Sequence, residues 1–550
     1  MSAAATLAAR LTGFAAVTCD VFDTAIRRRL ARPEDVHLVT GARLAAAGLT
    51  TLGPAAFQAA RIAAEAAMRA EAAARGEDEP GIAEVYAHLA ACAVVSDAAA
   101  AARVELAAEM AVCEAVPEMR AALAGRDVLF VSDNILPGDW IAELLVSCLY
   151  PGDARAISSA DTRASKHSGR MYPLVMAQVA KPAVHIGDNP HSDEVQARAA
   201  GLATIAVPRR LFAPEDAEIA ALDWPARLLH SHRRVMGATG LHRYATLLAI
   251  GWTLDILATA RARGVRRIYF GARDGWLPWQ IARRILSRSG EAIETRYLAL
   301  SRRGMEAPLA RNYLAQEGLG DAGPHILVDV GWRGSIQAAI GGEVFGCYLG
   351  LLPEALRPGI TPATTHCALF SFGHPAPLMD RVMDGYALPE LLFSAPQGSV
   401  TGYERRDGRI EPLFADDDPT RAAAFAAIAE GVMAEFDALD TMLAGAWGAI
   451  SATTMLHDVL PLLTKPDLAA VRTINAIPFI NGPHGAGHLP AINRMPWHEL
   501  LLHPGRALRR ARDCPWRAGW VRLHLPWPLP GMDYPDFAHR TRRLGLRPDA

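Results

Sequence analysis

The hydrophobic positions of the chain form two series of short apolar runs that alternate with helical segments. The first series occupies residues 15–20, 127–134, 154–160, 182–189 and 202–208. Between its first two members, residues 33–114 are rich in alanine, glutamate and arginine, a composition that favours helix and gives no strand signal. Short buried strands separated by helices are typical of a doubly wound parallel sheet. We therefore expect an α/β domain with a helical insertion after its first strand.

A second series of β-rich runs predicts a second α/β domain. Its members are residues 266–275, 294–304, 325–335, 344–352 and 365–373. Residues 402–414 are expected to form a hairpin, because Asp407-Gly408 is a dipeptide that favours a tight turn between strands. Beyond residue 416 the pattern is helical and then rich in proline.

The predicted fold class is α/β, with a doubly wound parallel-sheet core, an inserted helical cap, a second α/β domain and a mostly helical C-terminal extension. A length of 550 residues exceeds one ordinary core and predicts several domains. The predicted boundaries are residues 1–212 for the first domain, with the insert at about 30–118, and 226–415 for the second. Residues 211–225 resemble a linker, and residues 416–550 form the region rich in proline, arginine and tryptophan.

Composition narrows the class of protein. The chain is 51% hydrophobic and 21% charged, which indicates a soluble globular protein. Its formal net charge is −2, so the protein as a whole has no positive electrostatic potential that would attract nucleic acid. The seven cysteines are scattered and form no Cys-x-x-Cys pair. This spacing argues against a zinc site or a disulfide framework and predicts a reducing, cytoplasmic location.

No clear membrane partner is predicted either. The apolar stretch from Tyr244 is interrupted by Asp255, so a buried helix is expected there rather than a membrane span. The apolar N-terminal run ends in Asp20 instead of a cleavage site, so it is interpreted as the approach to a strand. The tail carries Trp497, Trp516, Trp520 and Trp527 among arginines. A packed extension is favoured over a surface for anionic membranes or nucleic acid, because no clean amphipathic helix is visible.

Polar groups follow several strands of the first predicted domain. Asp20 ends the first strand, Ser132 and Asp133 follow the second, and Asp188 ends a third within "GDNPHSD". Lys166 lies in "TRASKHSG", between the last two. Because parallel strands present their carboxyl ends at one edge of a sheet, these groups are expected to converge there.

The residue types suggest definite roles. A carboxylate such as Asp20 can be a nucleophile when cations neutralise it. Oxygen ligands from Asp20 and Asp188, with a backbone carbonyl, suit Mg²⁺. Ser132 would hold anionic oxygens, Lys166 would neutralise charge, and Asp193 would orient Lys166 or a metal-bound water. The structural alternatives are a helix cap for Ser132, a surface lysine for Lys166 and a helix N-terminal acid for Asp193.

In order, these motifs resemble the haloacid dehalogenase (HAD) superfamily over roughly residues 10–210. The matching positions are Asp20-Val-Phe-Asp-Thr24, Ser132, Lys166 and Gly187-Asp188-Asn-Pro-His-Ser-Asp193. The resemblance implies a Mg²⁺-dependent phosphatase with Asp20, Ser132 and Lys166 as catalytic residues and an aspartyl-phosphate on Asp20. It implies metal ligation by Asp20, Phe22 (through its carbonyl), Asp188 and Asp193. The candidate substrate-binding residues are Thr24, Asp133, Asn134, Arg273 and Arg333.

Phe22 departs from the phosphatase pattern. The residue two after the nucleophile is usually a second Asp that acts as general acid and base. Asp23 is one position further and, in an extended stretch, is expected to point to the opposite face and to support the following turn. An aromatic residue at this place resembles the dehalogenase branch, whereas the "GDN…D" motif favours phosphoryl chemistry, so dehalogenase-like chemistry stays open.

The second domain faintly resembles a type I phosphoribosyltransferase. Asp329 is expected to end a strand, and Gly331, Gly334 and Ser335 to open a helix that approaches phosphate. Arg273, Arg302, Arg303 and Arg333 would supply charge at the same edge. Loops with a purely structural role are the alternative.

Three functions remain open from the sequence. The first is a HAD-type hydrolase acting on a small phosphorylated substrate, a sugar phosphate or nucleotide. The second is a catalytically weakened phosphosugar-binding or scaffold protein, since the chain also resembles predicted bacterial HAD hydrolases associated with polysaccharide biosynthesis. Polysaccharide-assembly proteins would then be its partners. The third is a transferase seated in the second domain.

Overall fold

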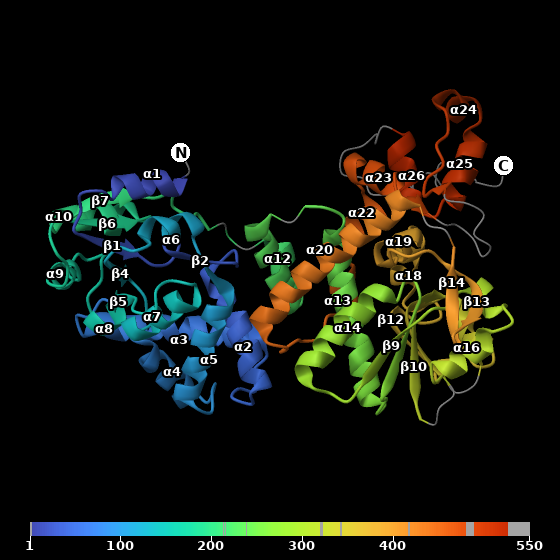
Figure 1. The fold of residues 1–550 in the computed structure, drawn as a ribbon, viewed down its shortest axis with the longest axis horizontal. Helices are drawn as coiled ribbons and strands as arrows, with labels where there is room; N and C mark the ends of the chain where they lie inside the picture. Colours follow the sequence, from blue (N-terminus) through green and yellow to red (C-terminus); the bar gives the residue numbers. More distant parts are fainter. Residues whose placement is uncertain are drawn as a thin grey trace. The chain divides into compact units, whose positions relative to one another are not determined.

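The computed structural model describes residues 3–212, 214, 216–237, 239–319, 323–341, 344–415, 418–479 and 489–525. The chain forms two compact units, Met1–Ala238 with Leu439–Gly448, and Thr239–Ala438 with Ala449–Ala550. Each unit contains one five-stranded parallel sheet with helices around it, which confirms the α/β class (Figure 1). The region 416–550 supplies residues to both units.

The first sheet has the strand order β5-β4-β1-β6-β7. Its strands are β1 (Ala16–Asp20), β4 (Val128–Ser132), β5 (Arg155–Ser158), β6 (Ala183–Gly187) and β7 (Ala203–Ala206), all paired in parallel. Every residue of β1 and β6 is buried, as expected for strands covered on both faces. The chain builds outward from β1 first on one side and then on the other. The carboxyl end of β1 is therefore the place where an open sheet forms a crevice.

A helical insert separates β1 from β4. It comprises α2 (Val36–Ala46), α3 (Pro54–Ala74), α4 (Ile82–Ala91) and α5 (Ala98–Val112), preceded by the 3-10 helix η1 (Pro33–Asp35). The antiparallel pair β2 (Ile26–Arg28) and β3 (Cys113–Ala115) closes its base. Proline opens α3 with a backbone angle that suits a first helical turn, and the Asp97 carboxylate accepts the Ala100 N–H at the start of α5. Figure 1 shows these four helices packed together beside α7 (Gly138–Ser147).

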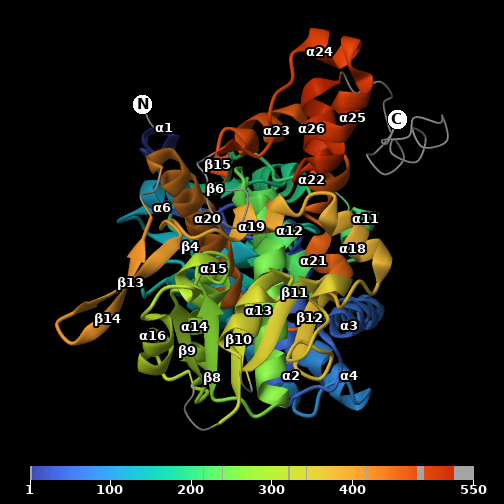
Figure 2. The ribbon, with the colours of Figure 1, turned by 90° about the vertical axis from the view of Figure 1, so that its right-hand side faces the viewer.

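The second sheet has the order β12-β11-β10-β8-β9 (Figure 2). Its strands are β8 (Arg267–Gly271), β9 (Glu294–Leu298), β10 (His325–Trp332), β11 (Val344–Leu351) and β12 (Thr365–Phe370), all parallel. The predicted hairpin is confirmed as β13 (Val400–Arg406) and β14 (Arg409–Phe414). Asp407 and Gly408 at its turn have φ angles of 50° and 78°, the left-handed values that a tight two-residue turn requires.

The apolar stretch from Tyr244 lies in α13 (His242–Ala262), and most of its residues are buried. Among the described residues, α13 is the one helix long and apolar enough to cross a membrane, and 67% of its most apolar window is buried inside the protein. The prediction of a buried helix is confirmed.

One expectation for the second unit is wrong. Asp329 does not end its strand, because β10 continues to Trp332 and Gly331 pairs with Gly350 of β11. A Cβ on Gly331 would lie 2.2 Å from the Gly350 carbonyl oxygen, and the φ of Gly331 is 119°. Gly331 therefore permits close strand packing, and the following helix α17 (Ser335–Ile340) begins only at Ser335.

The remaining elements connect and cover the two sheets. In the first unit they are α1 (Ala3–Arg10), α6 (Pro117–Leu123), α8 (Ser159–Thr162), α9 (Tyr172–Met176), η2 (Pro190–Gln196), α10 (Ala197–Ala199), α11 (Ala217–Ala220) and α12 (Trp224–Met236). In the second they include α14 (Trp276–Ser289), α15 (Arg302–Met305), α16 (Ala310–Gln316), η3 (Pro353–Ala355), α18 (Ala376–Met383) and α19 (Ala387–Phe393).

The C-terminal region is largely helical in the part that the structure describes. Its elements are α20 (Pro419–Leu443), α21 (Ala452–Leu456), α22 (Leu460–Thr464), α23 (Leu468–Asn475), β15 (Pro478–Phe479), β16 (Leu489–Pro490), α24 (Trp497–Leu502), α25 (Pro504–Asp513) and α26 (Arg517–His524). Trp516 and Trp520 are buried, as a packed extension requires, whereas Trp497 is exposed. Trp527 lies outside the described residues.

Candidate active site

Two carboxylates share one buried lysine at the carboxyl end of β1. The Lys166 Nζ donates to Asp20 Oδ1 at 2.5 Å and to Asp193 Oδ1 at 2.7 Å. Lys166 is 2% exposed and Asp193 is 1% exposed, so water screens neither ion pair strongly. Burial alone would lower the pKa of Lys166, but the two carboxylates outweigh it and hold that pKa above its usual range. The lysine is therefore a fixed positive charge beside Asp20.

Asp188 completes a group of three carboxylates that fits a divalent cation. Oxygen atoms of Asp20, Asp188 and Asp193 all lie within 4.8 Å of one another. Burial, with help from Asp193, raises the pKa of Asp188 to about 6. Burial also raises the pKa of Asp20, to about 7, against the opposing effect of Lys166. When all three carboxylates are ionised they carry two more negative charges than the lysine balances, and a single hard cation such as Mg²⁺ would neutralise these.

Behind Asp193 lies a chain of polar groups that the sequence analysis missed. The His185 Nε2 lies 3.1 Å from Asp193 Oδ1, and its Nδ1 lies 2.8 Å from the Thr18 hydroxyl. Burial lowers the pKa of His185, so the ring is neutral at pH 7. A neutral ring that donates to Asp193 from Nε2 accepts the Thr18 hydroxyl at Nδ1. The sequence held part of the signal, because Thr18 and His185 are polar residues inside the apolar strands β1 and β6, but their pairing in register is visible only in the structure.

The segment after β6 explains the glycine of the "GDN" motif. A Cβ on Gly187 would lie 2.3 Å from the Asp193 carboxyl group, so only glycine lets that carboxylate approach the strand end. The Asn189 side chain accepts the N–H groups of His191 and Ser192 and starts η2, a single π-helical stretch. The Asn189 N–H in turn donates to Asp193 Oδ2 at 3.0 Å. Both oxygens of Asp193 are thus held.

The groups after β4 differ in what they do. Ser132 is 2% exposed and lines the cavity described below, and its hydroxyl makes no hydrogen bond to a described residue. Asp133 accepts the N–H groups of Lys166 and His167, so its carboxylate holds the lysine loop. Asn134 accepts the Leu136 N–H and likewise shapes its own loop. All three line the cavity, whereas Thr24 is fully buried, its hydroxyl has no partner and it does not line the cavity.

Asp23 does not point away from the site, which corrects the expectation from an extended stretch. β1 ends at Asp20, and Asp23 adopts φ 62°, a left-handed conformation, while its N–H donates to the Ile26 carbonyl. Its carboxylate lines the cavity, and Arg210 lies 3.4 Å away. The Phe22 ring also lines the cavity, and the Arg28 guanidinium lies 4.2 Å from its centre. The left-handed turn is what brings Asp23 to the cavity edge.

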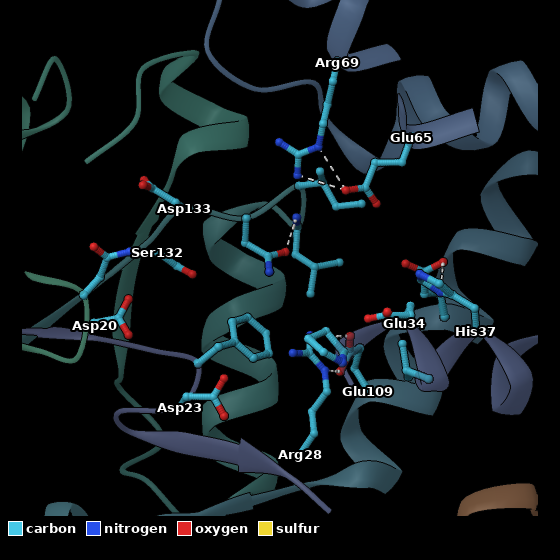
Figure 3. A pocket seen from close by; sticks show the side chains of 18 of the residues that line it. Asp20, Asp23, Arg28, Glu34, His37, Glu65, Arg69, Glu109, Ser132 and Asp133 are labelled. Atoms are coloured by element: carbon cyan, nitrogen blue, oxygen red, sulfur yellow. Dashed lines mark hydrogen bonds and ion pairs between the residues drawn. The ribbon is translucent and has the colours of Figure 1, made fainter. Parts of the chain in front are cut away.

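A cavity of about 620 Å³ lies between these groups and the helical insert (Figure 3). Figure 3 shows Asp20, Ser132 and Asp133 on one side, and Glu34, His37, Glu65 and Arg69 across from them. We call the charged lining away from the Asp20 edge the distal wall. It comprises Arg28, Glu34, His37, Arg61, Glu65, Arg69, Glu105 and Glu109.

The distal wall is built on buried ion pairs. Arg61 is fully buried and donates to both oxygens of Glu105 at 2.8 Å, and the Tyr86 hydroxyl donates to the same carboxylate at 2.6 Å. Burial opposes ionisation of Glu105, but Arg61 outweighs it and lowers its pKa to about 2. Burial lowers the pKa of His37, which keeps that ring neutral at pH 7.

Arg273 and Arg333 belong to the second unit and are not among the residues that line this cavity. Arg273 forms ion pairs with Asp274 at 2.8 Å and Glu390 at 3.4 Å, and Trp332 donates to the same Glu390 at 3.0 Å. Burial and the neighbouring Asp274 raise the pKa of Asp329 to about 7. Arg333 is exposed. A cavity of about 530 Å³ in this unit lies along α14 and β9.

The chain matches no model in a scan against protein families and no protein in a search of curated proteins. The geometry of the site and the sequence motifs therefore carry the functional argument.

Proposed function

We propose that the first unit is a HAD-type, Mg²⁺-dependent hydrolase of phosphate monoesters with Asp20 as the nucleophile. The observation that carries the proposal is the Asp20–Lys166–Asp193 arrangement beside Asp188 at the floor of a cavity. A carboxylate becomes a useful nucleophile when fixed positive charge offsets its repulsion from a phosphate dianion. Lys166 supplies such a charge.

The carboxylates fit a divalent cation, as their spacing and their excess negative charge indicate. Asp20 and Asp188, with the Phe22 carbonyl, would hold it, and Asp193 would support Lys166. When bound, the ion would withdraw charge from the phosphate and orient it toward Asp20.

The protein residues then divide the remaining work. Asp20 would attack phosphorus while the bond to the leaving-group oxygen breaks, which leaves a phosphoryl group on Asp20. Ser132, with its unpartnered hydroxyl, would donate to a phosphate oxygen. Water would then cleave the aspartyl-phosphate, releasing phosphate and restoring the carboxylate.

Phe22 cannot give a proton to the leaving group. Asp23 at the cavity edge, water or the substrate itself would have to supply that proton. If water or the substrate supplies it, esters with acidic leaving groups should react much faster than alkyl esters. The lack of a proton donor at position 22 also favours a second candidate, a phosphosugar-binding protein with little turnover. The transferase in the second unit gains no further support and stays a prediction.

The test is phosphate release from p-nitrophenyl phosphate and a panel of sugar phosphates with and without Mg²⁺. Asp20→Asn should lower kcat by at least about 10³-fold, and the matched change Asp329→Asn should leave it within about twofold. Activity that survives Asp20→Asn rules out the nucleophile assignment. Tight phosphate binding without release of p-nitrophenol would favour the binding protein.

A further inference from the structure

The arginines of the distal wall are already paired with carboxylates of the protein. Arg28 donates to both oxygens of Glu109, at 2.9 and 2.7 Å. Arg61 holds Glu105 in the same way and also reaches Glu65 at 2.8 Å. In a two-bond pair of this kind the planar guanidinium and the carboxylate match each other, and the pair resists exchange with another anion.

Arg69 is also occupied. It lies 2.9 Å from Glu65 and 2.5 Å from Glu79, so two carboxylates surround its single charge. The three arginines of the distal wall therefore all carry carboxylate partners. A substrate with a second anionic group would meet no available cation there.

Glu34 is the one acid of the distal wall without such a partner among the described residues. It is half-buried, lines the cavity and makes no ion pair that the structure records. Figure 3 shows Glu34 beside His37, across the cavity from Asp20. Because His37 is neutral, it does not balance the charge of Glu34. The four glutamates and three arginines of the wall thus leave one excess negative charge, on the side of the cavity across from Asp20.

Apolar side chains provide the rest of the lining on this side. Val36, Ile62 and Ala66 come from the helical insert, and Ile135 and Leu136 follow β4. A cavity of this volume has room for a monosaccharide or nucleoside, whose carbon face would rest on these residues. Hydroxyl or ammonium groups would then point to the charged lining.

We propose that the distal wall selects phosphate monoesters whose leaving group carries no second negative charge, and that Glu34 favours a hydroxyl- or amine-bearing group. This inference rests on the proposed hydrolase function. An anionic group would face Glu34 with no counter-ion and would be desolvated at a high cost. An ammonium group would form a charge-assisted hydrogen bond with it.

Three phosphates of nearly equal size test the inference: glucose 6-phosphate, glucosamine 6-phosphate and 6-phosphogluconate. With Mg²⁺, the amine should have a kcat/KM about threefold to tenfold above that of glucose 6-phosphate, and the carboxylate at least about 30-fold below it. Glu34→Gln should abolish the preference for the amine, and Glu34→Arg should raise kcat/KM for 6-phosphogluconate. The exposed Glu118→Gln on α6 is the matched control and should change none of these ratios.

Equal kcat/KM for the neutral and the carboxylate ester would overturn the inference, as would an amine preference that persists in Glu34→Gln. Failure of the proposed function looks different, because then p-nitrophenyl phosphate is not hydrolysed either. In that case calorimetric binding of the same three phosphates to the wild-type protein still decides the inference. The expected order of affinity is the same as the order of kcat/KM.

Discussion

Both parallel sheets place acids near the carboxyl ends of their central strands, and the acids of the first sheet line a cavity. In the first sheet the chain reverses its direction of growth at β1, and in the second it does so between β8 and β10. Asp20 ends β1, whereas Asp274 follows β8 and Asp329 lies within β10. Such reversal points are the usual ligand crevices of open α/β sheets. Topology alone therefore does not distinguish the two edges.

The cation at each edge makes the difference. Lys166 presents a compact ammonium group to Asp20 and Asp193, and the third acid, Asp188, leaves the cluster under-neutralised. Arg273 instead donates two hydrogen bonds from its planar guanidinium to Asp274 and forms a longer ion pair with Glu390. A guanidinium can donate to both oxygens of one carboxylate, whereas a lysine ammonium contacts one oxygen and leaves lone pairs of the carboxylate free for another ligand. Each edge has three carboxylates near one close cation, so the comparison indicates that the geometry of the cation and the cavity beside it mark a site better than a strand-end acid does.

Removing each cation should produce the largest contrast. Lys166→Met is expected to lower kcat/KM for p-nitrophenyl phosphate by about 10³-fold, because Asp20 loses its fixed counter-charge. Arg273→Met should leave the rate of the folded protein within twofold but reduce the free energy of unfolding by about 3–5 kcal/mol, since buried acids lose their partner. Steady-state kinetics and denaturant unfolding measure the two effects.

Lys181→Met is the control for the first variant, because Lys181 is exposed in the same unit. An Arg273→Met protein that is folded but as inactive as Lys166→Met would remove the distinction between the two edges.

Periodicity predicted the strands of both sheets, the helical insert and the hairpin, because short apolar runs and turn dipeptides are local signals. It missed the φ of 62° at Asp23, although Asp adopts left-handed angles more often than most residues, and so placed that carboxylate on the wrong face. It also placed Gly331 in a phosphate loop, although its role is close packing against Gly350. The ring-to-carboxylate contact of His185 depends on β6 and η2 meeting in space, and sequence spacing does not show such a contact.

Acid should affect helix α5 of the first unit and strand β10 of the second in opposite directions. The pKa of Glu105, lowered to about 2 from an ordinary 4.5, contributes about 3 kcal/mol of stability that is complete above pH 4.5 and lost as the pH falls toward 2. Asp329 has a raised pKa of about 7, so its folded form binds a proton first and β10 gains stability as the pH falls from 7 toward 4. Hydrogen exchange in α5 and β10 at several pH values, corrected for intrinsic rates, measures both.

Glu105→Gln should remove the loss of hydrogen-exchange protection of α5 at low pH. Asp329→Asn should remove the gain in protection of β10 as the pH falls from 7 toward 4. Parallel pH profiles in the two elements would contradict the assigned signs.

Divalent cations should stabilise the first edge only. At a Mg²⁺ concentration 100 times its dissociation constant, the first unit is expected to gain about 2.7 kcal/mol against unfolding, because the ion binds the folded carboxylate cluster. Hydrogen exchange in β1 and β6, with Mg²⁺ or with a chelator, reports the gain. Asp188→Asn should abolish it and Asp329→Asn should retain it. A gain of equal size in β10 would show that Mg²⁺ does not discriminate between the edges.

The smallest expected effect tests whether the Thr18–His185 hydrogen bond positions the site or whether Thr18 only contributes to the packing of the sheet. Thr18 and Thr204 pair in register with His185 from opposite sides, but only the Thr18 hydroxyl reaches its ring. Thr18→Val should leave His185 Nδ1 without a donor, cost about 1 kcal/mol of stability and lower kcat about fivefold with KM unchanged, because Asp193 and Lys166 lose orientation. Thr204→Val removes a buried hydroxyl that has no partner, so it should preserve kcat and stability. Equal losses in the two variants would assign the effect to the packing of the sheet, whereas a loss confined to Thr18→Val would extend the site from Asp20 through Lys166, Asp193 and His185 to Thr18.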